Sequence, residues 1–325
     1  MRAVLIVNPN ATSTTAAGRD LLAHALESRV HLQVLHTDHR GHASELARRA
    51  ADEGAAVIVV HGGDGTVSEV VNGLLGQPGH PAPGPLPAIA VVPGGSANVF
   101  ARSLGMSADP VQATNQLVDI LDAHRHDQRR WRRISLGHCG ERWFIFNAGM
   151  GLDGEVVAAM EAHRNKGKQV TAGRYVTRAV LSFFRAARRN PTLTVELPEH
   201  EPQAGIHFAF ICNSNPWTYA NTRAVWTNPG TGFESGLGVF ASRSMNVLAN
   251  LRLVRHMVGA PRADRPAGRH LLRKDDVPWV RVHASAPIAT QVDGDFLGMR
   301  SDLTFTAVPD VLDVVAPAKP SEASS

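Results

Sequence analysis

The chain has 325 residues, of which 43% are hydrophobic and 19% charged, and its formal net charge is +4. This length exceeds that of a usual single hydrophobic core, so we expect two domains, and the composition is that of a folded globular protein. The first apolar run is too short for a signal peptide, and no run reaches the length of a membrane span. The two cysteines, Cys139 and Cys212, provide neither a disulfide framework nor a thiolate metal site. We therefore expect a cytoplasmic protein.

The first part of the chain alternates between strand-like and helix-like patterns. Strands are predicted at residues 2–7, 31–36, 57–60 and 88–92, and helices around 21–26, 45–56, 67–75 and 109–124. Such alternation predicts a parallel sheet with helices on its faces. Ligands of these sheets bind beyond the carboxyl ends of the strands.

A glycine-rich turn, Gly62-Gly63-Asp64-Gly65-Thr66, lies between the third strand and an amphipathic helix. A glycine turn that leads into a helix N-terminus is suited to binding phosphate through backbone N–H groups. A carboxylate such as Asp64 is unfavourable beside an anion unless a metal such as Mg²⁺ bridges the two charges. Alternatively, Thr66 and Glu69 fit a capping box, which needs no ligand.

A second glycine turn, residues 93–102, follows the fourth strand and also leads into a predicted helix. Its Ser96 resembles the nucleophile of the hydrolase elbow. That motif requires a final glycine, where this chain has Asn98, so the sequence argues against acyl-transfer chemistry.

From residue 134 onward, short strand-like runs dominate and predict a β-rich antiparallel sandwich. The runs are 142–146, 193–197, 208–212, 280–283 and 303–308, with helices expected near 154–162, 172–189 and 246–258. The last helix has the pattern of a lid over an apolar site, although core packing explains that pattern more simply. We place the domains at 1–133 and 134–308, with 309–316 returning to the first domain and 317–325 as a disordered tail.

Two acid pairs flank glycines: Asp153 with Glu155, and Asp293 with Asp295. Asp-Gly is also a common hairpin turn, so each pair alone has a purely structural interpretation. Together with a phosphate turn they suggest phosphoryl transfer to a hydroxyl, which needs a proton acceptor and a carboxylate that holds metal. The sixteen histidines show no His-x-x-x-His or Cys/His metal pattern.

Arginines gather around Trp131 and after Phe184. Such patches can attract anionic lipid head groups or nucleic acid, although a solvated basic face is the more frequent explanation.

A set of motifs along nearly the full chain resembles the diacylglycerol kinase and sphingosine kinase catalytic-domain family, and in particular its soluble bacterial lipid kinases. The motifs are the two glycine turns, Asn8-Pro9, Phe146-Asn147-x-Gly149-x-Gly151-x-Asp153 and Val292-Asp293-Gly294-Asp295. The resemblance implies an α/β nucleotide-binding domain with a parallel sheet, similar to that of NAD kinase. It also implies a β-rich lipid domain, with the active site in the cleft.

The resemblance implies roles for individual residues as well. ATP would be bound by Asn8, Pro9, Asn10, Ala11, Thr12, Thr37, Gly62, Gly63, Asp64, Gly65, Thr66, Glu69, Gly95 and Ser96. Asp64 would lie close to the Mg²⁺ of the nucleotide, and Asp295 would accept the proton of the acceptor hydroxyl with Asp293 beside it.

This sequence departs from the family pattern at three positions. The family has a glutamate at Asp295, an aspartate at Val99 and often a glycine soon after its first Asn-Pro, where this chain has Asn10-Ala11-Thr12.

We therefore expect an ATP- and Mg²⁺-dependent kinase that transfers the γ-phosphoryl group to a hydroxyl of diacylglycerol or a related lipid. The lipid would be presented at a membrane surface, with peripheral contact to its inner face. We expect no nucleic-acid partner, and a homodimer is compatible with this function. The alternatives are an NAD kinase, which shares the first glycine turn, and a non-catalytic lipid-binding pseudokinase.

Overall fold

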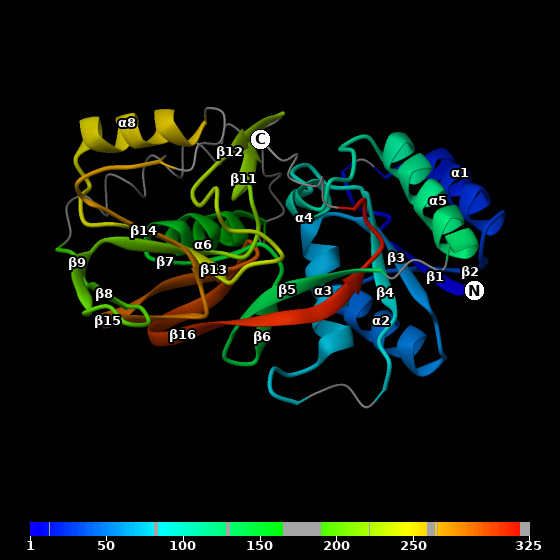
Figure 1. The fold of residues 1–325 in the computed structure, drawn as a ribbon, viewed down its shortest axis with the longest axis horizontal. Helices are drawn as coiled ribbons and strands as arrows, with labels where there is room; N and C mark the ends of the chain where they lie inside the picture. Colours follow the sequence, from blue (N-terminus) through cyan, green and yellow to red (C-terminus); the bar gives the residue numbers. More distant parts are fainter. Residues whose placement is uncertain are drawn as a thin grey trace. The chain divides into compact units, whose positions relative to one another are not determined.

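In a computed structural model of this protein, the chain forms two compact units (Figure 1). The first unit comprises residues 1–134 and 310–325, and the second comprises residues 135–309. The structure describes residues 1–12, 14–80, 84–127, 131–164, 190–220, 222–258, 264 and 266–318. Within these residues, no helix combines the length and the apolar character needed to cross a membrane.

The first unit is built on a parallel sheet in the order β4-β3-β1-β2. The strands are β1 (Arg2–Val7), β2 (His31–His36), β3 (Val57–Gly62) and β4 (Ala88–Pro93). Every residue of β3 and β4 is buried, which explains their almost continuous apolar sequences. The end of β16 (Asp295–Val314) joins this sheet, because Val314 pairs in parallel with Ile89.

Helices cover both faces of this sheet, with α1 and α5 on one face and α2 and α3 on the other (Figure 1). They are α1 (Ala16–Glu27), α2 (His42–Asp52), α3 (Asp64–Leu75), the short α4 (Val99–Ser103) and α5 (Pro110–Asp127). Helices α2 and α3 approach closely at Gly73, where a Cβ would lie 2.4 Å from the carbonyl oxygen of Ser44.

Helix α2 begins three residues before the predicted start and ends four residues before the predicted end. Gly41, at φ 89°, is its N-cap, and Gly54 at φ 77° follows its end. Left-handed backbone at these glycines interrupts the helix, although the alanine-rich sequence continues to Ala56.

The second unit is rich in antiparallel strands, in the order β14-β13-β10-β7-β15-β16. The main strands are β5 (Arg132–Cys139), β6 (Arg142–Phe144), β7 (Asn147–Met150), β8 (Leu193–Glu196), β9 (Gln203–Ile206), β10 (Phe208–Cys212), β13 (Leu237–Ser242), β14 (Leu271–Val277) and β15 (Trp279–Val292). A separate hairpin comprises β11 (Thr218–Ala220) and β12 (Arg223–Val225). β15 extends well beyond the predicted 280–283. Its pairing with β16 shifts register between His283 and Ile288 and then continues, although the residues in between do not alternate apolar and polar.

Two helices of the second unit match predictions, α6 (Leu152–Arg164) and α8 (Val247–Met257). The predicted helix at 172–189 and most of the predicted tail, 319–325, lie outside the described residues. The core of the unit includes Phe144 and Phe305, whose rings meet edge to face with centroids 6.2 Å apart.

Candidate functional site

The two glycine turns of the first unit pack directly against each other. The N–H of Gly94 donates to the carbonyl of Gly62 at 2.9 Å. A Cβ on Gly95 would lie 2.7 Å from the Cα of Gly63, and a Cβ on Gly94 would lie 3.1 Å from the Cα of Gly62. These glycines are therefore required by the close approach of two backbones, whether or not a ligand is bound.

Gly65 is different, because it is exposed and no heavy atom lies within 4 Å of the position of a Cβ. It belongs to the first turn of α3, where free N–H groups and the positive end of the helix dipole favour an anion. The open space at Gly65 is thus where a phosphate can approach the backbone of this turn.

Asp64 connects the two turns through its carboxylate. Its Oδ2 accepts the N–H of Val99 at 2.9 Å, and its Oδ1 accepts the N–H of Phe100 at 3.0 Å. Burial raises the pKa of Asp64, and these N–H groups oppose that shift. A carboxylate has about four lone-pair sites, so the residue can accept these hydrogen bonds and still contact a cation such as Mg²⁺.

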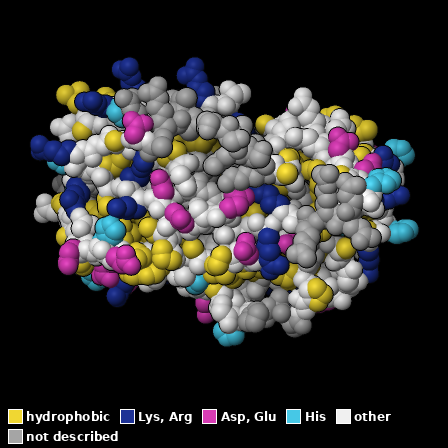
Figure 2. Space-filling view, in the orientation of Figure 1, with side chains coloured by type: hydrophobic (Ala, Val, Ile, Leu, Met, Phe, Trp, Pro, Cys, Tyr) yellow, Lys and Arg dark blue, Asp and Glu magenta, His cyan; other side chains and the backbone are white. Residues whose placement is uncertain are grey.

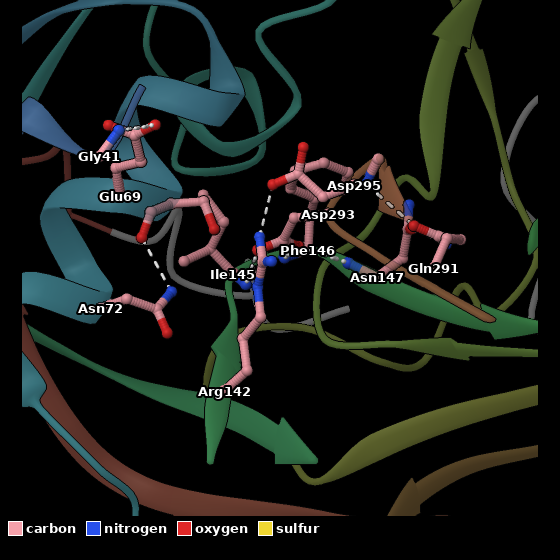
Figure 3. Close-up of polar contacts among 12 residues, drawn as sticks. Gly41, Glu69, Asn72, Arg142, Ile145, Phe146, Asn147, Gln291, Asp293 and Asp295 are labelled. Carbon is pink, nitrogen blue, oxygen red and sulfur yellow. Dashed lines mark hydrogen bonds and ion pairs between the residues drawn. The ribbon is translucent and has the colours of Figure 1, made fainter. Parts of the chain in front are cut away.

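The structure excludes the capping box formed by Thr66 and Glu69. Helix α3 begins at Asp64 with Gly63 as its N-cap, so Thr66 already lies inside the helix. Glu69 instead accepts the N–H of Gly41 at 3.0 Å (Figure 3). Thr66 accepts a hydrogen bond from the side chain of Asn8 at 3.1 Å. These two residues therefore tie the first glycine turn to the segments that follow β1 and β2.

The other residues with a predicted role in ATP binding lie beyond the same ends of the strands. Asn8 follows β1, and its side chain accepts the N–H of Asn10 at 3.0 Å. Thr37 follows β2, is buried, and donates its N–H to the carbonyl of Val7 at 2.9 Å. Ser96 follows β4 and is exposed. The predicted residues Pro9, Ala11 and Thr12 belong to the same connection as Asn10. The first unit thus gathers these residues at the carboxyl edge of its sheet, where α/β proteins bind ligands.

A group of potential metal ligands that the sequence analysis did not identify follows β2. Asp38, His39 and His42 offer ligating atoms that all lie within 4.8 Å of one another. The Oδ1 of Asp38 is 2.5 Å from Nδ1 of His39 and 2.6 Å from Nδ1 of His42. The spacing His-x-x-His is the only sequence signal for this group, and we assign it no part in the chemistry below.

In the second unit, Asp293 and Gly294 form the tight turn between β15 and β16. Both have positive φ, 49° and 79°, as a type I′ hairpin turn requires. The buried carboxylate of Asp293 accepts the N–H groups of Ile145, Phe146 and Asn147 at 2.9, 3.1 and 3.3 Å. Asp293 therefore anchors the hairpin onto the segment between β6 and β7.

Asp295 begins β16 and has a more accessible carboxylate. Its side chain is 26% exposed and its Oδ2 lies 2.6 Å from a guanidinium nitrogen of Arg142 (Figure 3). Of this acid pair, Asp295 is the one that solvent or a substrate can reach. Arg142 was missed by the sequence analysis, because it is 153 residues from Asp295 and carries no motif.

A buried polar network lies beside this hairpin. Gln291 donates to the side-chain oxygen of Asn147 at 2.9 Å and to the carboxylate of Asp153 at 2.5 Å. The Oε1 of Gln291 accepts the N–H of Gly294 at 2.9 Å. Burial raises the pKa of Asp153 to about 6, and the hydrogen bond from Gln291 opposes this shift. The side chain of Gln291 thus links Asp153 to the turn that precedes Asp295.

We predict that Asp153→Asn changes how stability depends on pH. The folded-state pKa of about 6 lies above 3.8, the ordinary pKa of an aspartate, so between these values the folded protein binds a proton that the unfolded chain does not. The Asp153 contribution to the free energy of unfolding therefore falls as pH rises through this window, by about 1.4 kcal/mol per pH unit. Urea unfolding of both proteins between pH 4 and 7.5 measures this difference, and parallel curves would contradict it.

Comparison with known proteins finds relatives of the first unit. Residues 2–125 match the family model described as "Diacylglycerol kinase catalytic domain". The predicted family resemblance is confirmed for these residues. One relative, named "Probable lipid kinase YegS-like", from Chromohalobacter salexigens, is 32% identical over 144 residues, which are 44% of this chain and 42% of that protein. A diacylglycerol kinase of Staphylococcus haemolyticus is 32% identical over 34% of this chain and 28% of its own length. The matches thus span less than half of these curated relatives.

A solved structure extends the likeness to the whole fold. A diacylglycerol kinase from Bacillus anthracis aligns over 97% of both chains with a TM-score of 0.71 and 16% sequence identity. At that identity the likeness concerns the fold alone. The predicted fold class, an α/β domain with a parallel sheet and a strand-rich C-terminal domain, is confirmed.

Proposed function

We propose that this protein is an ATP-dependent lipid kinase that phosphorylates a hydroxyl of diacylglycerol or a related lipid. The observation that carries the proposal is the match of residues 2–125 to the diacylglycerol kinase catalytic domain. The named relatives, a lipid kinase and a diacylglycerol kinase, support the same class of reaction.

In this proposal the first unit binds the nucleotide. The backbone at Gly65 and the N-terminus of α3 would hold the phosphates through N–H groups, since the chain has no Gly-x-x-x-x-Gly-Lys-Ser/Thr loop. Asp64 would contact Mg²⁺, which when bound neutralises charge on the phosphates. Asn8, Thr66 and Glu69 would keep the turn in shape through the hydrogen bonds described above.

The proton transfer is assigned to Asp295 of the second unit. The lipid hydroxyl would attack the γ-phosphorus, the bond to the oxygen between the β- and γ-phosphates would break, and ADP would leave. Asp295 would accept the hydroxyl proton, and Arg142 would hold its carboxylate in place at 2.6 Å. Asp293 would act as a positioning residue, because its carboxylate is taken up by three backbone N–H groups.

A radiolabel experiment tests this function. The purified protein is incubated with Mg²⁺ and ATP labelled at the γ-phosphate, together with dispersed diacylglycerol, sphingosine or NAD. We expect label in an organic-extractable product. Label transferred only to NAD would support an NAD kinase instead, and ligand binding with no turnover for any acceptor would support a pseudokinase.

A further inference from the structure

Helix α8 of the second unit carries large apolar side chains on its outer face. Val247, Leu248, Leu251 and Val254 are 42%, 77%, 62% and 52% exposed. At 3.6 residues per turn these four positions lie within an arc of about 120°. They form a continuous stripe along the helix, which we call the α8 stripe.

The opposite face of α8 packs against the hydrophobic core. Met257 is buried, and Leu253 packs with it against the cluster that contains Phe208, Phe210 and Phe240. A surface helix normally turns its polar face to water. Because the inner face of α8 is already packed, core packing does not account for the α8 stripe.

The exposure on α8 is concentrated rather than scattered. Among the described residues nine large hydrophobic side chains are exposed, and four of them belong to this one helix. The other five are Met1, Leu21, Val34, Val111 and Met299, and they belong to other elements. Single exposed hydrophobic residues are normal, whereas a contiguous group indicates a binding surface.

The charged side chains of α8 itself are positive. Arg252 and Arg255 are exposed on the same helix, and residues 247–257 include no Asp or Glu. Figure 2 shows hydrophobic and Lys or Arg side chains at the edge where Figure 1 places α8, with an Asp or Glu side chain beside them. By helical spacing, Arg255 falls between Leu251 and Leu248, and Arg252 falls at the border of the stripe.

A cavity beside α8 is also lined by both apolar and basic side chains. It has a volume of about 370 Å³ and is lined by Arg252 and Leu253 of α8 and by Arg269 and His270 of the segment before β14. Two arginines and a histidine among the lining residues suit a phosphate-bearing head group.

The charge pattern decides which partner the surface fits. A second copy of this chain that packed its α8 stripe symmetrically would bring the arginines of both copies together, which is unfavourable. A bilayer with anionic lipids offers acyl chains to the stripe and phosphates to the arginines. This combination of an apolar face with basic residues is typical of helices that lie in the membrane interface.

We propose that α8 is a membrane-docking helix that inserts its stripe at the head-group boundary of an anionic bilayer, with Arg252 and Arg255 bound to lipid phosphates. This inference deepens the proposed function, since docking would bring a lipid kinase to an acceptor embedded in the bilayer. Vesicle binding itself does not depend on turnover.

The test compares the full chain with the double variant Leu248→Ser/Leu251→Ser. Binding is measured by co-sedimentation with vesicles of phosphatidylcholine and phosphatidylglycerol, and with vesicles of phosphatidylcholine alone. We expect the wild type to bind the anionic vesicles and the variant to lose at least about tenfold in partitioning. The matched control is Leu21→Ser/Val111→Ser, which removes two hydrophobic side chains of 55% and 52% exposure from the first unit and should bind as the wild type does.

A second pair of readouts separates docking from catalysis and from self-association. Phosphorylation of vesicle-embedded diacylglycerol should fall in the Leu248→Ser/Leu251→Ser variant, while phosphorylation of a water-soluble short-chain diacylglycerol stays unchanged. If no lipid is phosphorylated but the variant still loses vesicle binding, the proposed function fails and the docking helix stands. If the variant bound vesicles as well as the wild type does, the proposal that α8 docks on the membrane would be overturned. The proposal would also be overturned if sedimentation velocity showed that the wild type is a dimer, that this dimer binds no vesicles, and that the variant is a monomer.

Discussion

Replacing Asp295 by Asn is expected to lower kcat for lipid phosphorylation by about 10²- to 10⁴-fold, the usual contribution of a general base. Asn has the same shape as Asp and its carbonyl oxygen can still accept the hydrogen bond from Arg142, but it cannot take up the hydroxyl proton. The affinity for ATP should change little, since Asp295 belongs to the second unit and the predicted nucleotide residues belong to the first. Steady-state kinetics together with binding of a fluorescent ATP analogue measure both quantities.

The chain offers a matched control for this variant. Asp302 lies on the same strand, is also partly exposed, and pairs with Arg281 at 2.7 Å. Asp302→Asn therefore removes an Asp–Arg ion pair of similar geometry without touching the Asp293–Gly294 turn, and it should leave kcat unchanged. Asp295→Glu keeps the carboxylate but lengthens the side chain by one methylene, and should retain a measurable fraction of activity. A wild-type kcat in Asp295→Asn would show that another group accepts the proton.

Local patterns were sufficient to predict the elements of the first unit. The buried strands β1, β3 and β4 are almost continuous apolar runs, whereas β2 alternates apolar and polar residues. Each is followed by a polar or glycine-rich connection, so all four were found with nearly their observed bounds. The bounds of two elements were predicted wrongly. The early end of α2 depends on left-handed backbone at Gly54, and the length of β15 depends on its pairing with β16.

The candidate site could be predicted only as a set of residue types. The motifs identified Asp64, Asp293 and Asp295, but a sequence does not say which carboxylates are occupied by backbone N–H groups. The structure shows that both oxygens of Asp293 are occupied in this way and that Asp295 is not buried. Arg142 and Gln291 were missed because the acceptors of their side-chain N–H groups are more than a hundred residues away and neither residue belongs to a spaced motif.

The second large effect is expected at Asp64, where the structure combines a cap and a candidate metal ligand. Asp64→Ala removes the acceptors of the Val99 and Phe100 N–H groups, which should reduce the free energy of unfolding by about 1–3 kcal/mol. If Asp64 also contacts Mg²⁺, turnover should fall to background in this variant. The only other carboxylate among the predicted site residues at the two glycine turns is that of Glu69, and its Oε1 accepts the N–H of Gly41.

Two further variants separate the cap from the metal role. Asp109 caps α5 by accepting the N–H of Gln112 at 2.9 Å, so Asp109→Ala should cost about 1 kcal/mol of stability and leave turnover unchanged. Asp64→Asn keeps one carbonyl acceptor for the cap but removes the negative charge. Its activity, measured over a range of Mg²⁺ concentrations below its unfolding temperature, should need at least about tenfold more Mg²⁺ for half-maximal rate. If only stability falls and the Mg²⁺ requirement matches that of the wild type, Asp64 is a cap between the two glycine turns and the metal is held elsewhere.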